Sequence, residues 1–283
     1  MNAPLRLGFS PCPNDAFVFH ALVHGLVAPD LRWEVVMDDV EALNERVRRG
    51  QLDVAKISVH AYAHVADRYA LLPSGGALGY GVGPLLVARD PELDLTRATV
   101  ATPGGRTTAN LLLDLFAPNG AQRTAMRYDR IVPAVVAGEV DAGLIIHESR
   151  FTYGDHGLHA VQDLGAWWEA RTGRPIPLGA VAIRRDLPAE RIARVAAAVR
   201  ASVEAAWADP EASEAYQARH AQEMDPAVRR RHVETYVNDF TRDVGCEGRE
   251  AVRTLFAQAE ARGLFPAPVH DTFVPHGVRA PTP

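Results

Sequence analysis

The 283-residue sequence has little lysine, little cysteine and no long apolar run. Its 30 basic residues are 29 arginines and a single lysine, Lys56, so that one lysine invites a closer look. The cysteines, Cys12 and Cys246, are too few and too far apart for a disulfide framework or a CxxC metal pair. No apolar stretch approaches the roughly 18 residues that span a bilayer. The net charge of −5 does not favour nucleic acid as a partner.

The remaining composition is that of an ordinary globular protein. Hydrophobic residues make up 47% and charged residues 23%. At roughly 150 residues per domain, the length suggests about two domains. The N-terminus runs almost directly into residues 5–9, without the charged and apolar regions of a secretion signal, which predicts a cytoplasmic location.

The first 59 residues alternate between strand-like and helix-like segments. We expect strands over 5–9, 33–37 and 54–58, with helices over 16–26 and 40–49 between them. Asn14 or Asp15 is placed to cap the first of these helices. Alternation of strands and helices predicts a parallel sheet covered by helices.

The same plan recurs from about residue 98 to residue 146. Strands are expected over 98–101 and 142–146, with helices over 109–116 and 129–137. Gly50-Gln51-Leu52-Asp53-Val54 is matched 88 residues later by Gly138-Glu139-Val140-Asp141-Ala142, which favours a duplicated α/β unit.

Two apolar runs, over 84–90 and 179–186, each end in Arg-Asp and are typical of strands that cross between two lobes. The sequence therefore predicts an α/β protein whose second lobe (91–184) is inserted into the first (1–90 and 185–283). The C-terminal part is expected to be helical and to pack back on the first lobe.

Ligands of open parallel sheets bind beyond the carboxyl ends of the strands. Those ends carry Ser10, Ser58, Thr107, Thr108 and His147. Two pairs of such loops facing each other across a hinge would form one cleft between the lobes.

Thr107 and Thr108 follow a Gly-Gly turn and open a helix, where free N–H groups and the positive end of the helix dipole favour an anion. One of the two threonines could instead be only an N-cap. Lys56 lies inside an apolar strand and needs an anion or a carboxylate partner, unless its side chain reaches solvent from the strand end.

His147 directly follows a buried strand and could present its imidazole to the cleft as a general base. A hydrogen-bonded structural histidine is the alternative. Glu148 is not expected to orient it, because adjacent strand residues point to opposite faces. The pairs His20/His24 and His60/His64 have no third ligand at typical metal spacing, so no metal site is expected.

Several segments together are similar to one enzyme family, the 1,4-dihydroxy-6-naphthoate synthases of the futalosine route to menaquinone. The resemblance covers most of the chain, and the matching segments are residues 8–15, Lys56-Ile57-Ser58, residues 105–109 and residues 143–153. It implies the fold of a type II periplasmic binding protein used as a cytosolic lyase without metal or organic cofactor.

The resemblance also implies roles for individual residues. His147 matches the family's general base, and Lys56, Ile57, Ser58, Thr107 and Thr108 match its substrate-binding segments. We add Ser10 and Asn14, from the motif after the first strand, to the expected substrate-binding residues. The implied reaction converts cyclic dehypoxanthine futalosine to 1,4-dihydroxy-6-naphthoate and dihydroxyacetone, starting with removal of a carbon-bound proton by His147.

Two alternatives stay open at this point. Chorismate dehydratase of the same pathway shares the fold, but it would be expected to lack Ile146-His147-Glu148. A solute-binding protein of a transporter would need an export signal. The expected partner is a small-molecule carboxylate, with neither nucleic acid nor membrane. The sequence does not indicate the oligomeric state, the general acid or the extent of lobe closure.

Overall fold

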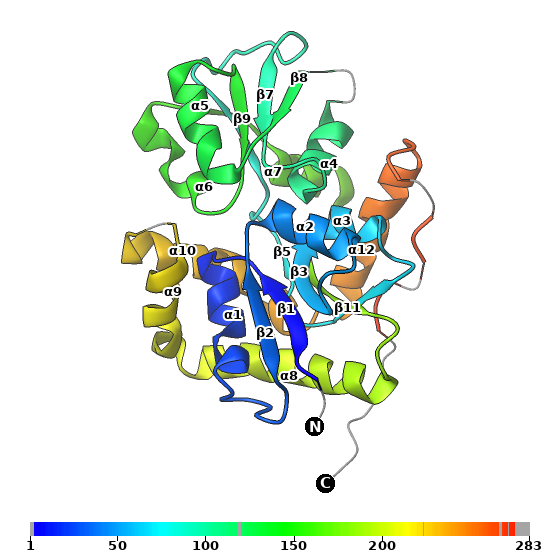
Figure 1. Cartoon of the computed structure of the whole chain (residues 1–283). Helices are drawn as coiled ribbons and strands as arrows, with labels where there is room; N and C mark the ends of the chain where they lie inside the picture. Colours follow the sequence, from blue (N-terminus) through cyan, green and yellow to red (C-terminus); the bar gives the residue numbers. More distant parts are fainter. Residues whose placement is uncertain are drawn as a thin grey trace.

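The computed structural model has two α/β lobes (Figure 1). The structure describes residues 3–117, 120, 122–222, 224–265, 268–270 and 272–274. In Figure 1 the second lobe, in green, lies above the blue strands and helices of the first lobe, and the yellow helices of the C-terminal part lie beside the first lobe. No helix in these described ranges is long and apolar enough to cross a membrane.

The first lobe is built on a six-stranded sheet with the order β2-β1-β3-β11-β4, and β5 pairs with β11. Strands β2, β1 and β3 are parallel, and β11 runs antiparallel to β3. The strands are β1 (Leu5–Phe9), β2 (Trp33–Met37), β3 (Val54–Ser58), β4 (Tyr69–Leu71), β5 (Ala77–Gly79) and β11 (Ile176–Arg184).

The second lobe is built on a five-stranded sheet with the order β10-β6-β9-β7-β8. Strands β8, β7 and β9 are parallel, and β6 runs antiparallel to β9. Read from β8, this order repeats the pattern of the first sheet, as a duplicated unit would. The strands are β6 (Leu85–Ala88), β7 (Thr99–Thr102), β8 (Gln122–Ala125), β9 (Ala142–Ile145) and β10 (His159–Asp163).

Helices cover both sheets, and a helical C-terminal part packs back on the first lobe as expected. Ser202 of the long helix α8 accepts a hydrogen bond from the N–H of Leu22 and donates one to the carbonyl of Val18 in α1. The helices are α1 (Pro13–Val23), α2 (Val40–Arg48), α3 (Val59–Ala63), α4 (Thr108–Phe116), α5 (Ile131–Ala137), α6 (Ser149–Thr152), α7 (Leu164–Thr172), α8 (Ala189–Ala208), α9 (Glu214–His220), α10 (Pro226–Tyr236), α11 (Asp239–Arg242) and α12 (Gly245–Glu260).

The start of α1 differs from the expectation. The N-cap is Cys12, so Asn14 and Asp15 lie within the first turn and neither caps the helix. Pro13 suits the first helical position because it has no N–H to leave unpaired. Strand β8 was also missed, because this mostly exposed edge strand carries no apolar run.

The two crossings between the lobes come earlier in the chain than the expected boundaries. Strand β6 lies within residues 1–90 but pairs in the second sheet, and β11 lies within residues 91–184 but pairs in the first. Both strands are largely buried apolar runs. Such runs identify a strand in the sequence, but they do not say which of two similar sheets it joins.

The close backbone contact between Gly83 and Gly165 can be tested by mutation. It precedes β6, and its backbone packs against the start of α7: a Cβ on Gly165 would lie 2.7 Å from the Gly83 Cα, and a Cβ on Gly83 would overlap the Gly165 backbone. We expect Gly83→Ala to lower the free energy of unfolding by about 1–3 kcal/mol through overpacking, measured by urea denaturation. Gly154→Ala is the control, because its Cβ would meet nothing within 4 Å. Equal stability of the two variants would contradict the close approach.

Candidate active site

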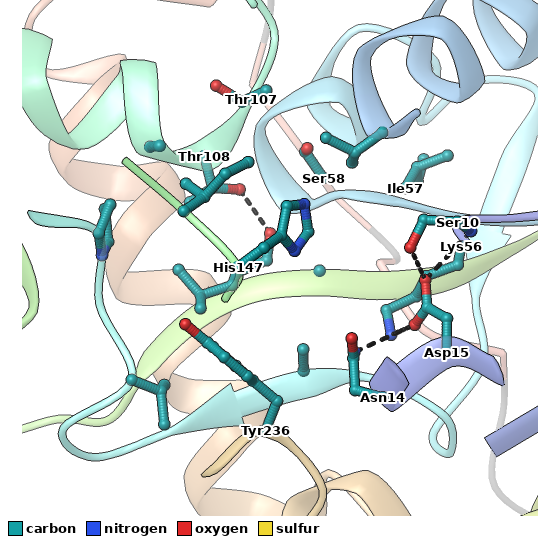
Figure 2. A pocket seen from close by; sticks show the side chains of 18 residues that line it. Ser10, Asn14, Asp15, Lys56, Ile57, Ser58, Thr107, Thr108, His147 and Tyr236 are labelled. Atoms are coloured by element: carbon teal, nitrogen blue, oxygen red, sulfur yellow. Dashed lines mark hydrogen bonds and ion pairs between the residues drawn. The ribbon is translucent and has the colours of Figure 1, made fainter. Parts of the chain in front are cut away.

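A cavity of about 90 Å³ lies between the two lobes, where the carboxyl ends of their parallel strands meet. The structure brings all eight residues expected at the site to the lining of this cavity. These are Ser10, Asn14, Lys56, Ile57, Ser58, Thr107, Thr108 and His147. Figure 2 shows them together with two lining residues that the sequence analysis did not propose, Asp15 and Tyr236.

His147 occupies the middle of the cavity in Figure 2. It lies two residues after the end of β9 and has a φ of 59°, a left-handed conformation that histidine adopts more readily than most residues. Its ring packs edge-on against Tyr128, with 4.8 Å between the ring centroids. Within the described residues its buried Nε2 has no hydrogen-bond partner.

The electrostatics of His147 favour the neutral imidazole. Burial lowers its pKa from 6.5 to about 4, an effect that Asp15 opposes and Lys56 reinforces. At neutral pH the ring is therefore uncharged and has one nitrogen able to accept a proton. A neutral imidazole in the lining of a cavity can act as a general base toward a bound ligand.

Lys56 has a carboxylate partner inside the protein. Its Nζ lies 2.8 Å from Asp15 Oδ1, and the two side chains are only 7% and 5% exposed. The lysine does not reach solvent. The hydroxyl of Ser10 donates to Asp15 Oδ2 at 2.8 Å, so Ser10 and Lys56 hold the two oxygens of one carboxylate. The positive charge is thus balanced without a ligand.

The hydroxyls of the two threonines are engaged in structural hydrogen bonds. Thr107 is the N-cap of α4, where its Oγ1 accepts from the N–H of Asn110. Thr108 donates to the carbonyl of Leu178 at 2.7 Å and accepts from the N–H of His60. Figure 2 shows the first of these bonds from Thr108. What the helix start offers a ligand is its backbone N–H groups, which the first turn of a helix leaves unpaired.

A buried histidine that the sequence analysis missed lies behind the cavity. His232 of α10 is fully buried, and its Nε2 lies 2.9 Å from Asn14 Oδ1. Burial lowers its pKa well below the usual value. The imidazole is then neutral and donates its Nε2 proton to Asn14. Glu148 Oε2 lies 3.8 Å from Nδ1 of this histidine.

Asp15, His232 and Tyr236 are the main residues that sequence reasoning missed at the site. Asp15 stands beside Asn14 in the motif after β1, where the sequence indicates only a possible helix cap. His232 and Tyr236 lie one turn apart on α10. Nothing in the sequence connects that C-terminal helix with the strand ends. Burial raises the pKa of Tyr236 to about 12, so its hydroxyl keeps its proton.

The loop over residues 104–108 closes the cavity by docking on the first lobe. The N–H of Arg106 donates to Glu41 Oε1 at 3.0 Å, and its guanidinium pairs with Glu45. His60 Nδ1 lies 3.1 Å from the carbonyl of Thr107. A Cβ on Gly104, which has a φ of +133°, would meet the side chain of Glu41 at 2.5 Å.

Metal ligands are not gathered at this site. His60 and His64 approach to 3.4 Å between their Nε2 atoms. Among the described residues no group of three or more histidine, cysteine, aspartate or glutamate side chains is placed to hold a metal ion.

The fold is that of the periplasmic binding proteins. The alkanesulfonate-binding protein of Xanthomonas axonopodis superposes with a TM-score of 0.70 at 17% identity, covering 95% of this chain and 96% of that one. A solved protein of Archaeoglobus fulgidus superposes with a TM-score of 0.89 at 39% identity, covering 93% of this chain and 98% of that one.

Sequence relatives narrow this class to one family. A sequence model of the menaquinone biosynthesis family matches residues 5–261. Relatives named 1,4-dihydroxy-6-naphthoate synthase are 57% identical in Thermus thermophilus and 51% identical in Streptomyces coelicolor, over 92% and 93% of this chain and 95% of each relative. The chain belongs to this menaquinone biosynthesis family.

The buried histidines predict how stability depends on pH. Burial lowers the pKa of His60 from 6.5 to about 4. Below pH 6.5 His60 becomes protonated in the unfolded chain but stays neutral in the folded chain. The free energy of unfolding therefore falls as the pH falls toward 4. We expect His60→Gln to reduce this loss between pH 6.5 and 4.5 by about 2 kcal/mol, measured by urea denaturation. The exposed His156→Gln is the control. A His60→Gln curve parallel to that of the wild type would contradict the shift.

The buried ion pair predicts an asymmetry between single and double variants. Lys56→Met leaves Asp15 as an uncompensated buried charge and is expected to cost about 3–5 kcal/mol of stability. The double variant Lys56→Met/Asp15→Asn is expected to recover most of this loss. Arg6→Met is the control, because the Arg6–Asp53 pair is more exposed and should contribute about 1 kcal/mol or less. Additive losses in the double variant would show that the pair is not coupled.

Proposed function

We propose that this protein is a 1,4-dihydroxy-6-naphthoate synthase, a lyase that converts cyclic dehypoxanthine futalosine to 1,4-dihydroxy-6-naphthoate and dihydroxyacetone. The names of its relatives at 57% and 51% identity support the product. The single observation that supports the chemistry is the neutral imidazole of His147 in the lining of the cavity between the two lobes.

The first chemical step is removal of a carbon-bound proton by His147. The negative charge that develops on the substrate is stabilised by a fixed donor, the Ser58 hydroxyl. Cleavage of a carbon–carbon bond then releases the three-carbon fragment and leaves an aromatic ring. The side chains of Ile57, Ile146 and Leu178 line the cavity and limit the access of water to the anionic intermediate.

Substrate binding relies on donors from both lobes. The carboxylate of the substrate binds where the α4 N-terminus meets the end of β3, because N–H groups and the helix dipole favour an anion there. Lys56 uses one of its three N–H donors for Asp15, and another is available to a substrate oxygen. Ser10 and Asn14 hold Asp15 and line the same wall. Substrate entry requires the 104–108 loop to leave α2 and α3.

The biological setting is part of the proposal. We infer that the enzyme works in the cytoplasm on a small-molecule carboxylate, with His147 as base and with no metal or organic cofactor. Neither nucleic acid nor membrane is expected as a partner.

The direct test is incubation of the purified protein with cyclic dehypoxanthine futalosine and chromatographic detection of the naphthoate and dihydroxyacetone. Chorismate is tested as an alternative substrate under the same conditions. Formation of the naphthoate supports the proposal. Dehydration of chorismate would identify the other enzyme of the pathway, and tight binding of either compound without turnover would favour a binding protein.

A second prediction concerns His147 alone. His147→Asn removes the base but keeps a polar side chain in the cavity, so turnover should fall about 10²- to 10⁴-fold. Affinity for the product should change little, because the base acts on the proton and not on the carboxylate. Exposed His156→Asn is the control. Turnover of the His147→Asn variant at the wild-type rate would remove His147 from the mechanism.

A further inference from the structure

Asn44 lies directly behind the cavity but does not line it. It belongs to α2 of the first lobe and is only 1% exposed. A buried amide has to satisfy both its oxygen and its two N–H donors within the protein. The partners of Asn44 are therefore informative, and they include a cavity residue and the other lobe.

Toward the cavity, Asn44 holds Ser58 by two hydrogen bonds. The backbone N–H of Ser58 donates to Asn44 Oδ1 at 3.0 Å, and Asn44 Nδ2 donates to Ser58 Oγ at 3.1 Å. The amide cannot be turned over without placing an N–H against the Ser58 N–H and an oxygen against the Glu41 carboxylate. Its orientation is thus fixed by its neighbours.

The bond from Asn44 Nδ2 to Ser58 Oγ determines whether the Ser58 hydroxyl can act as a donor. Its oxygen already accepts a proton from Asn44, so the hydroxyl can offer its own proton elsewhere. Ser58 is the N-cap of α3, but its side chain makes no capping hydrogen bond. Ser58 lines the cavity, and no acceptor for its hydroxyl proton is found among the described residues. The hydroxyl proton of Ser58 is therefore available to an acceptor on a ligand in the cavity.

Away from the cavity, Asn44 joins the contact between the lobes. Asn44 Nδ2 donates to Glu41 Oε2 at 2.9 Å, and Glu41 Oε1 accepts the N–H of Arg106 at 3.0 Å. The carbonyl of Arg106 lies 3.4 Å from the same Nδ2. A continuous set of hydrogen bonds thus leads from the cavity hydroxyl through α2 to the closing loop of the second lobe.

We propose that Asn44 is a positioning residue, which directs the Ser58 hydroxyl into the cavity as a donor to an anionic oxygen of the ligand. Docking of the 104–108 loop holds the Asn44 amide in the orientation that this requires. The identity of the ligand as a hydroxylated aromatic carboxylate rests on the proposed function. Asn44 acts only through Ser58 and makes no contact with the ligand.

The experiment is a double-mutant cycle on the dissociation constant of 1,4-dihydroxy-6-naphthoate, measured anaerobically by fluorescence with Asn44→Ala, Ser58→Ala and the double variant. Loss of one hydrogen bond to a charged group should weaken binding about tenfold or more. If Asn44 acts through Ser58, the double variant should bind about as weakly as Ser58→Ala alone. A double variant weakened by the product of the two single effects would overturn the proposal.

The exchange Asn44→Asp/Glu41→Gln keeps the shape and the net charge of this cluster, because the new glutamine amide can donate to the new aspartate where Asn44 donated to Glu41. The aspartate accepts the Ser58 proton, so this variant should bind the naphthoate weakly although its thermal unfolding remains cooperative. In the Ser58→Ala background the same exchange should weaken binding much less. Glu45→Gln is the matched control, since it breaks the ion pair with Arg106 on the same loop without touching Asn44. A change of affinity as large in Glu45→Gln as in the exchange would assign the effect to loop docking and overturn the role of Asn44.

The outcome is separable from that of the proposed function. Wild-type turnover of cyclic dehypoxanthine futalosine tests the function, and the cycle tests the role of Asn44. A non-additive cycle in a protein that binds the naphthoate but does not form it would support the positioning role and contradict the function. A wild-type protein that does not bind the naphthoate would overturn both.

Discussion

Docking of the 104–108 loop on α2 and α3 is the contact on which the rest of the site depends. It brings the N-terminus of α4 against the end of β3, and both line the cavity together with His147. Burial of the imidazole is the main reason that its pKa falls to about 4. The same contact orders Asn44 and, through it, Ser58. A chemical property of one residue therefore follows from the packing of two lobes.

Most polar groups of the cavity have hydrogen-bond partners within the protein. The groups that lack a partner indicate which chemical groups a ligand would need. Lys56 and Asp15 balance each other, and the Thr107 and Thr108 hydroxyls are bound to backbone. In the described part of the chain, no hydrogen-bond partner is found for the His147 imidazole or for the Ser58 hydroxyl proton, and the first N–H groups of α4 are available as well. One proton acceptor and several donors suit a molecule that gives up a proton and becomes anionic. Apolar walls around these groups suit an aromatic ring.

The sequence revealed those parts of the site that lie at strand ends. Parallel strands share one carboxyl edge, so Ser10, Ser58, Thr107 and His147 could be placed together from the alternation of elements alone. Residues that reach the site from helices, away from the strand ends, could not be predicted. Asn44, His232 and Tyr236 come from helices whose packing faces carry no local signal. Likewise, the sheet joined by β6 or β11 depends on long-range pairing, which apolar composition does not specify.

The most direct test of the account is the pH dependence of kcat/KM for naphthoate formation, which reports the ionisation of the free enzyme. A neutral His147 predicts a rate that stays level from pH 8 down to about pH 5 and falls only near the lowered pKa, about 4. A fall with an apparent pKa near 6.5 that disappears in His147→Asn would contradict the account, because it would show a base in contact with water instead of one enclosed between the lobes.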